Sequence, residues 1–223
     1  MFKTKLRSKI VPLVLVLIFC LTACTARVSR LDVETDTWAD DAYAAAYLPY
    51  FGEDKAVLWK ELSIADEMLK TDTTTPFLQY AEGVEIPETD AKGRLSFLFD
   101  QETSQLYRIQ YEWRREYRFE ENRTTLERLL SYFTGLYGES ANLFATLSIS
   151  QLLEDYDNVR GDRTGKYKEI WNVPGEWHYE SLEKRFPGKD IPVTLTLDVV
   201  FGEDVVNYAV AYFIDAWSLE GQR

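Results

Sequence analysis

Two pairs of segments with alternating apolar side chains constrain the fold of this chain most strongly. In the first pair, every second residue of 95–99 and of 107–113 is large and apolar, and a polar turn at 101–105 separates the two segments. The second pair, 193–199 and 206–212, shows the same alternation around the turn Gly202-Glu203-Asp204. A period of two is typical of a strand with one buried face. The sequence therefore predicts two antiparallel hairpins.

Helix signals precede the first hairpin. Residues 38–47 are rich in alanine, with Thr37 as the expected N-cap and Leu48-Pro49 as the end. A second helix is predicted to start near Glu53-Asp54 and to bury one apolar stripe against a sheet. That stripe consists of Val57, Leu58, Leu62 and Ala65, with Glu61 beside them.

The strongest helix signal lies between the two hairpins. Thr124 and Glu127 have capping-box spacing, and Gly138 is a natural stop. Apolar residues recur between them at helical spacing: Leu126, Leu129, Leu130, Phe133 and Tyr137. Residues 143–156 predict a short additional helix, and residues 77–86 and 167–173 predict two further strands.

These elements predict an α+β fold, an antiparallel sheet packed by two or three helices. The order of helix followed by hairpin occurs twice, over about 53–113 and 124–213, with little residue identity between the two stretches. We therefore expect one globular α+β domain over residues 38–223, with two tandem units, 38–118 and 119–223, as the alternative.

The beginning of the chain has the pattern of an export signal. Four basic residues lie within positions 3–9, the run 10–21 is apolar apart from Pro12, and Leu21-Thr22-Ala23-Cys24 follows. The apolar run is too short to span a bilayer, which takes about 20 residues. The ending Leu-Thr-Ala-Cys resembles the bacterial lipobox. The alternative is an ordinary signal peptide that happens to contain a cysteine.

The lipobox resemblance implies where the protein is located. Residues 1–23 would be removed, Cys24 would be lipidated and become the mature N-terminus, and residues 24–37 would form the lipidated end and its tether. The 13 tether residues 25–37 would span roughly 20 Å as a flexible coil. We expect a bacterial lipoprotein that faces outside the cytoplasm; Thr25 is not an aspartate-type retention signal, so inner and outer membrane both stay open.

Charge and cysteine content exclude several classes of function. Removal of the four basic residues of the leader would change the formal charge from −12 to −16 and leave 200 of the 223 residues. Such a chain repels nucleic-acid phosphates and anionic headgroups, so we expect no nucleic-acid partner and membrane attachment through the lipid on Cys24 alone. Cys20 would be lost with the leader, so the mature domain would have neither a disulfide nor a thiol nucleophile.

A second resemblance covers about a dozen residues. The segment Phe51-Gly52 to Leu62 is similar to the opening helix of small α+β modules in the outer-membrane-assembly small lipoprotein and in the β-lactamase-inhibitor-protein family. In those modules a glycine precedes a helix that packs on antiparallel strands. The glycine that closes that helix is replaced here by Ser63-Ile64. The resemblance implies a non-enzymatic binding scaffold.

The chain has few residues of the kinds that carry catalysis. His178 is the only histidine, which argues against zinc clusters and against Ser-His and Cys-His catalysis. Acidic pairs such as Asp40-Asp41 are numerous, but most lie at helix starts or turns. The segment 155–162 departs from a calcium loop at its fifth and sixth positions. We therefore predict no metal, no cofactor and no catalytic residue.

Two aromatic clusters are candidates for recognition. Trp171, Trp177 and Tyr179 flank the turn Pro174-Gly175 and form either a recognition surface or a satellite core under a loop. The stretch Trp113-Arg114-Arg115 either binds a sugar or carboxylate or simply ends the first hairpin with Trp113 in the core.

The expected function is a non-catalytic protein-binding or envelope-associated module that uses the sheet face or the turn near 171–179. The alternative is a carboxylate-dependent hydrolase of envelope polysaccharide, which a deep cleft with two facing carboxylates, one of raised pKa, would favour. A solute-binding lipoprotein usually needs two larger α/β lobes, and this chain does not provide them.

Overall fold

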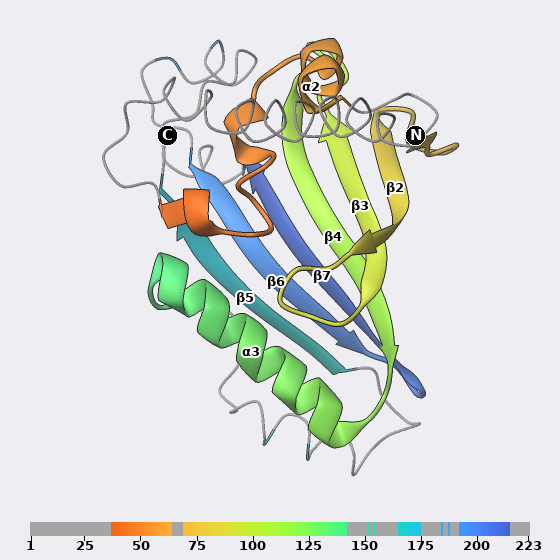
Figure 1. The fold of residues 1–223 in the computed structure, drawn as a ribbon, viewed down its shortest axis with the longest axis vertical. Helices are drawn as coiled ribbons and strands as arrows, with labels where there is room; N and C mark the ends of the chain where they lie inside the picture. The colour runs from red at the N-terminus through yellow and green to blue at the C-terminus, as the bar shows by residue number, and fades with distance from the viewer. Residues whose placement is uncertain are drawn as a thin grey trace, which may run out of the picture. The chain divides into compact units, whose positions relative to one another are not determined.

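The computed structural model describes residues 37–63, 69–141, 165–174 and 192–214, together with residues 151, 154, 184 and 187 (Figure 1). All of these belong to one compact unit. Its elements in chain order are η2 (Thr37–Asp40), η3 (Leu48–Tyr50), α2 (Lys55–Leu62), β1 (Lys70–Thr71), β2 (Leu78–Glu85), β3 (Lys92–Phe99), β4 (Leu106–Glu116), α3 (Phe119–Tyr137), β5 (Gly165–Val173), β6 (Val193–Phe201) and β7 (Val205–Ile214).

The strands form one antiparallel sheet of seven strands in the order β1-β2-β3-β4-β7-β6-β5. Both predicted hairpins are confirmed, with Phe97 opposite Ile109 and Leu197 opposite Val210. Strand β4 pairs with β7, where Tyr111 lies opposite Val210, so the two halves of the chain share a single sheet. The fold is therefore α+β, as expected.

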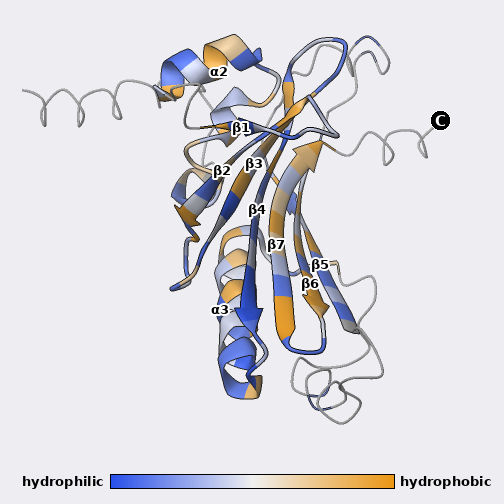
Figure 2. Cartoon of the chain, turned by 90° about the vertical axis from the view of Figure 1, so that its right-hand side faces the viewer, coloured by the Kyte–Doolittle hydropathy of each residue, from blue (hydrophilic) through white to orange (hydrophobic). Residues whose placement is uncertain are grey.

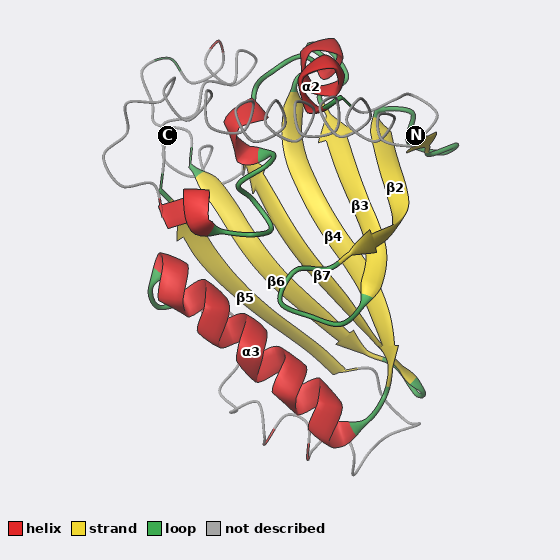
Figure 3. Ribbon diagram, in the orientation of Figure 1, coloured by secondary structure: helices red, strands yellow, loops and turns green. Residues whose placement is uncertain are grey.

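Helices α2 and α3 pack on the same face of the sheet (Figures 2 and 3). From α2, the Trp59 ring lies 5.2 Å from the ring of Phe97 on β3. From α3, the ring of Phe133 lies 5.4 Å from that of Trp171 on β5. Edge-to-face and tilted ring pairs of this kind add to the burial of large apolar areas. The core therefore lies between these helices and one side of the sheet.

Helix α3 begins earlier than its sequence signals suggested. It starts at Phe119, and its N-cap residue Arg118 makes no side-chain capping bond. The capping box at Thr124 was wrong, because the Thr124 hydroxyl donates to the Glu120 carbonyl inside the helix at 2.8 Å. Gly138 ends the helix with φ of 81°, as predicted.

Helix α2 begins where it was predicted to begin, but its apolar stripe differs from the predicted one. The Asp54 carboxylate caps the helix by accepting from the backbone N–H of Ala56 at 2.7 Å. Leu58 and Trp59 are buried, whereas Val57 is 40% exposed, so placing Val57 in the apolar stripe was wrong. Ser63 ends the helix in the left-handed conformation, with φ of 53°.

The segment 38–47 is not an α-helix. It contains the short 3-10 helix η2 and turns over residues 42–47. The Asp41 carboxylate accepts from the backbone N–H of Tyr43, two residues later, at 2.9 Å. Local side-chain bonds of this kind compete with helix formation. Of the predicted helix 143–156, only Gln151 and Glu154 lie inside the described residues, and both are helical.

Candidate functional site

The second face of the sheet differs from the core face in composition and in cover. Among the described residues, α2, α3 and the segment 39–51 contact the core face, and no described element packs on the other face (Figure 2). We call this second face the polar face. Its residues on the six long strands alternate with the core residues: Leu78, Tyr80, Glu82, Glu85, Lys92, Arg94, Ser96, Leu98, Arg108, Gln110, Glu112, Arg114, Glu116, Val205, Asn207, Ala209, Ala211, Phe213, Thr194, Thr196, Asp198, Val200, Lys166, Lys168, Ile170 and Asn172.

A row of charged side chains crosses the polar face. Strand register places Glu82 opposite Arg94 and Arg94 opposite Glu112. Arg94 Nε lies 3.4 Å from Glu112 Oε2. On the other side of β7, Lys168 Nζ lies 3.4 Å from Asp198 Oδ1. These four side chains are between 34% and 40% exposed, so the ion pairs are open to solvent and add little to stability.

Arg94 also contacts an aromatic ring. Its guanidinium carbon lies 4.4 Å from the centre of the Tyr80 ring, and its Nε donates to the Ser96 hydroxyl at 3.3 Å. A cation over an aromatic ring is attracted by the negative ring face. Tyr80 and Arg94 therefore present one rigid amphipathic surface on β2 and β3.

The opposite end of the polar face is more apolar. Leu78, Leu98, Arg108 and Phe213 lie in one register row across β2, β3, β4 and β7. All four are half-buried. The guanidinium carbon of Arg108 lies 5.5 Å from the centre of the Phe213 ring. This row offers apolar area together with one cation.

A groove with a volume of about 690 Å³ lies over the charged row. Its lining includes Arg94, Glu112, Arg114, Asp198 and Asn207. Gly93 also lines it, and a Cβ built at that position would lie 2.3 Å from the carbonyl oxygen of Glu112. The absence of a side chain at Gly93 thus permits the close approach of β3 and β4 beside the groove.

Two carboxylates lie in the same register row of this groove. Glu112 and Asp198 both lie opposite Ala209, so their backbones are about 10 Å apart, two strand spacings. Each carboxylate is paired with a cation, and each is more than one third exposed. An acid/base pair needs one carboxyl group that is shielded from solvent and holds its proton. Neither Glu112 nor Asp198 is shielded in this way.

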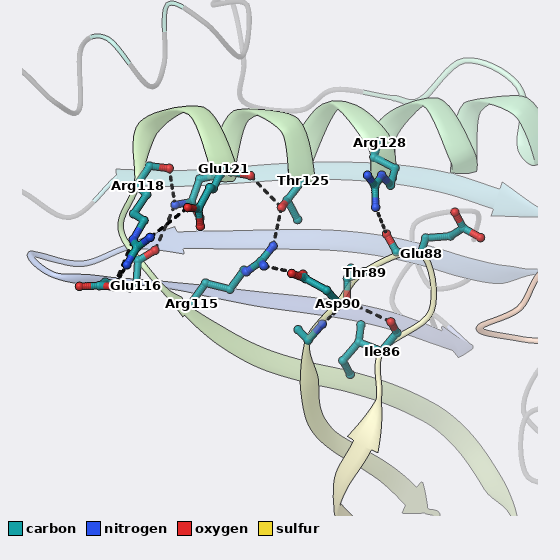
Figure 4. A network of polar contacts seen from close by, with 12 residues as sticks. Ile86, Glu88, Thr89, Asp90, Arg115, Glu116, Arg118, Glu121, Thr125 and Arg128 are labelled. Carbon is teal, nitrogen blue, oxygen red and sulfur yellow. Dashed lines mark hydrogen bonds and ion pairs between the residues drawn. The ribbon is translucent and has the colours of Figure 1, made fainter.

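The stretch Trp113-Arg114-Arg115 is divided between three environments. Trp113 lies in the core, which is the second of the two alternatives for this stretch. Its ring stacks on that of Tyr208, with 5.1 Å between the ring centres. Arg114 is exposed on the polar face. Arg115 donates to Thr125 Oγ1 on α3 at 2.8 Å and to Asp90 Oδ1 at 2.5 Å (Figure 4).

The turn that contains Asp90 is held to α3 by further bonds. Arg128 donates to the Glu88 carbonyl at 3.4 Å, and Thr89 donates to the Ile86 carbonyl at 3.0 Å. Figure 4 shows the Arg128 contact between the helix and the turn from β2 to β3, and the Thr89 contact within the turn. This network is therefore a structural connection on the helix side of the sheet.

A buried carboxylate, Asp41 of the acidic pair Asp40-Asp41, is bound by three tyrosines. Asp41 is fully buried and accepts hydrogen bonds from the hydroxyls of Tyr132 at 3.2 Å, of Tyr137 at 2.6 Å and of Tyr212. Burial raises the pKa of Asp41 above its ordinary value, while these hydrogen bonds act in the opposite direction. Because Asp41 has no exposed surface, a substrate has no access to it, and the cluster holds the N-terminal segment on the core.

A second buried carboxylate lies at the C-terminal end of α3. Glu169 on β5 is 4% exposed and accepts from the hydroxyls of Ser140 and Tyr167, each at 2.5 Å. Burial and the adjacent carboxylate raise the pKa of Tyr167. Glu169 therefore joins the segment after α3 to the sheet.

Trp171, one of the three predicted recognition residues, lies in the core. It is 2% exposed and offers no surface to a partner, because its ring packs under Phe133 of α3. Trp177 and Tyr179 lie outside the described residues. The same holds for Cys24, His178 and the segment 155–162. For Trp171, the satellite-core alternative agrees with the structure.

Within the described ranges, no group of three or more His, Cys, Asp or Glu side chains is close enough to hold a metal ion. No helix in the described part of the chain is both long and apolar enough to cross a bilayer. In comparisons with known proteins, no family model, curated protein or solved structure matches this chain.

Proposed function

We propose that this chain is a membrane-anchored extracytoplasmic lipoprotein whose folded domain is a non-catalytic protein-binding module. The polar face is its binding surface. The observation that carries the proposal is that the described helices cover only one face of a seven-stranded sheet. The other face presents half-buried aromatic and aliphatic side chains among charged ones.

The composition of the polar face supports recognition of a protein. Interfaces are enriched in aromatic side chains and arginine. Tyr80 under Arg94 and Phe213 under Arg108 are two such pairs on this face. Held against rings, these arginines lose less conformational freedom when a partner binds than free side chains would.

The rival proposal is a carboxylate-dependent hydrolase of envelope polysaccharide. Its best candidates among the described residues are Glu112 and Asp198, because they lie in one groove on one register row. Both carboxylates are held in ion pairs with Arg94 and Lys168 and are open to solvent, whereas a general acid is a carboxyl group shielded from water, and this argues for the binding function.

We further propose that the two halves of the domain are tandem units. The first half contributes α2 followed by β1–β4, and the second contributes α3 followed by β5–β7. The last strand of each half pairs with that of the other. Both helices pack on the same face. Such an arrangement leaves one continuous polar face that crosses both units.

The anchor belongs to the same proposal. Lipid on Cys24 would hold the domain within roughly 20 Å of the membrane, given the 13 residues of the expected tether. A domain held there meets partners in or near the envelope at high effective concentration. The partner of the polar face is thus expected to be a protein of the cell envelope.

The test is site-specific photo-crosslinking of the full-length lipoprotein in intact cells. A photo-reactive amino acid replaces Asn207, which is exposed in the groove of the polar face, or Glu127, which is exposed on α3. We expect one discrete adduct from position 207, none from position 127, and loss of the adduct in Cys24→Ala. Adducts of equal yield from both positions, or none from position 207, would refute the proposal.

A further inference from the structure

The polar face carries charge of the opposite sign to the rest of the chain. The whole chain has a formal charge of −12. In the charged row, each carboxylate has its own cation: Glu82 pairs with Lys70 at 3.2 Å, Glu112 with Arg94 and Asp198 with Lys168. These carboxylates are therefore already neutralised within the protein.

The next register row has two cations and no carboxylate on β4, β7, β6 and β5. Strand pairing aligns Arg114, Asn207, Val200 and Lys166 across β4, β7, β6 and β5. Arg114 and Lys166 are exposed, and neither forms an ion pair with another residue of the described ranges. Three strand spacings separate them, about 14 Å. This row is called the basic row below.

A third cation lies at the apolar end of the face. Arg108 donates to the side-chain oxygen of Gln110, which is uncharged, and lies over Phe213. It lies six residues from Arg114 on β4, about 20 Å along the strand. The face thus combines an apolar row with one cation and, some 20 Å away, a basic row.

We propose that the partner surface recognised by the polar face is an acidic protein segment that also carries apolar side chains. Its carboxylates pair with Arg114 and Lys166, and its apolar side chains contact Leu98 and Phe213. This inference rests on the proposed function and specifies the chemistry of its partner. Complementary charge steers the two proteins together and selects against wrong partners.

The apolar row distinguishes this partner from a simple polyanion. A polyphosphate or a polysaccharide acid needs cations but gains nothing from Leu98 or Phe213. An anionic bilayer would be repelled by a chain of this net charge. A segment with both carboxylates and apolar groups uses both parts of the face.

The probe is a random copolymer of glutamate and tyrosine, measured against the full-length lipidated protein in zwitterionic nanodiscs. Polyglutamate of equal length and a lysine–tyrosine copolymer are the comparison ligands. We expect the glutamate–tyrosine copolymer to bind at least tenfold more tightly than either. Binding should weaken as salt rises from 50 to 500 mM, because the contacts are exposed and screened.

Charge reversal locates the binding on the basic row. Arg114→Glu combined with Lys166→Glu should weaken binding of the copolymer at least tenfold. Lys60→Glu, a reversal of an exposed cation on α2, is the matched control and should leave binding unchanged. Circular dichroism of each variant confirms that the fold is retained.

Three results would contradict an acidic partner, and each points to a different occupant of the polar face. Equal binding of polyglutamate would make the face a general polyanion site, and tighter binding of the lysine–tyrosine copolymer would reverse the charge of the partner. Self-association that depends on Arg114 would identify a second copy as the occupant. Each result overturns the acidic partner but leaves the crosslink from position 207, and so the proposed function, intact.

Discussion

The hydroxyl of Tyr137 donates a hydrogen bond to Oδ2 of Asp41 at 2.6 Å. This bond joins the last residue of α3 to the N-terminal segment, and the Tyr212 hydroxyl adds β7 to the same oxygen. A fully buried carboxylate is tolerated because several donors replace its lost hydration. The cluster thus fixes the beginning of the domain, next to the expected tether, against helix and sheet.

Removal of one donor should destabilise the domain. Tyr137→Phe removes a bond to a buried carboxylate and should lower the free energy of unfolding by about 2 kcal/mol. Tyr80→Phe removes a hydroxyl from the polar face and should change it by less than about 0.5 kcal/mol. Urea unfolding of both variants measures the difference, and equal losses would contradict the role of the cluster.

Asp41 should also make stability depend on pH. Because its pKa is raised in the folded state, its contribution is fully present below the unfolded value of 3.8 and is lost as the pH rises through the folded pKa. Asp41→Asn cannot ionise. The stability of the native protein relative to this variant should therefore fall as the pH rises above about 4 in urea titrations. A difference that stays constant or grows with pH would exclude this account.

The hairpins could be predicted because their signal is local. Alternation sets the buried face of each strand, and short turns set its partner. The pairing of β4 with β7 joins residues such as Arg108 and Phe213, far apart in the chain, and alternation alone does not specify it. The one-sheet architecture, and with it the continuous polar face, therefore could not be predicted from sequence patterns.

The predictions that failed for single residues failed for similar physical reasons. The start of α3 was missed because Asn122 is polar yet buried, with its amide donating to the carbonyls of Glu116 and Arg118. An aromatic residue such as Trp171 suits either a surface or a core, and only the helix above it decides. The hydroxyls that bind Asp41 come from residues 91, 96 and 171 positions away, so no local pattern marks this residue.

Two glycines should respond to alanine in opposite directions. Gly93→Ala places a methyl group 2.3 Å from the Glu112 carbonyl oxygen and should destabilise the domain by about 3 kcal/mol. Gly135 lies inside α3 with open space around it, so Gly135→Ala should stabilise by up to about 1 kcal/mol. Thermal unfolding compares the two, and a stable Gly93→Ala would show that β3 and β4 can separate.

Helix capping gives a further contrast. Asp54→Ala removes the cap of α2 and should cost about 1 kcal/mol. Thr124→Ala lies in the interior of α3, so it should be neutral or stabilise by a few tenths of a kcal/mol, about the difference in helix propensity. If Thr124→Ala cost as much as Asp54→Ala in chemical denaturation, α3 would begin near Thr124 instead of Phe119.

Maleimide labelling of single cysteines in intact cells tests most directly whether the polar face is a binding surface. Asn207→Cys reports on the groove, and Ser131→Cys, exposed on α3, is its control; the unsubstituted protein gives the background. We expect Asn207→Cys to label at least tenfold more slowly in the envelope than after purification, because the partner covers it, while Ser131→Cys labels equally fast in both. Equal rates for Asn207→Cys in both settings would show the polar face uncovered and contradict its role as the binding surface.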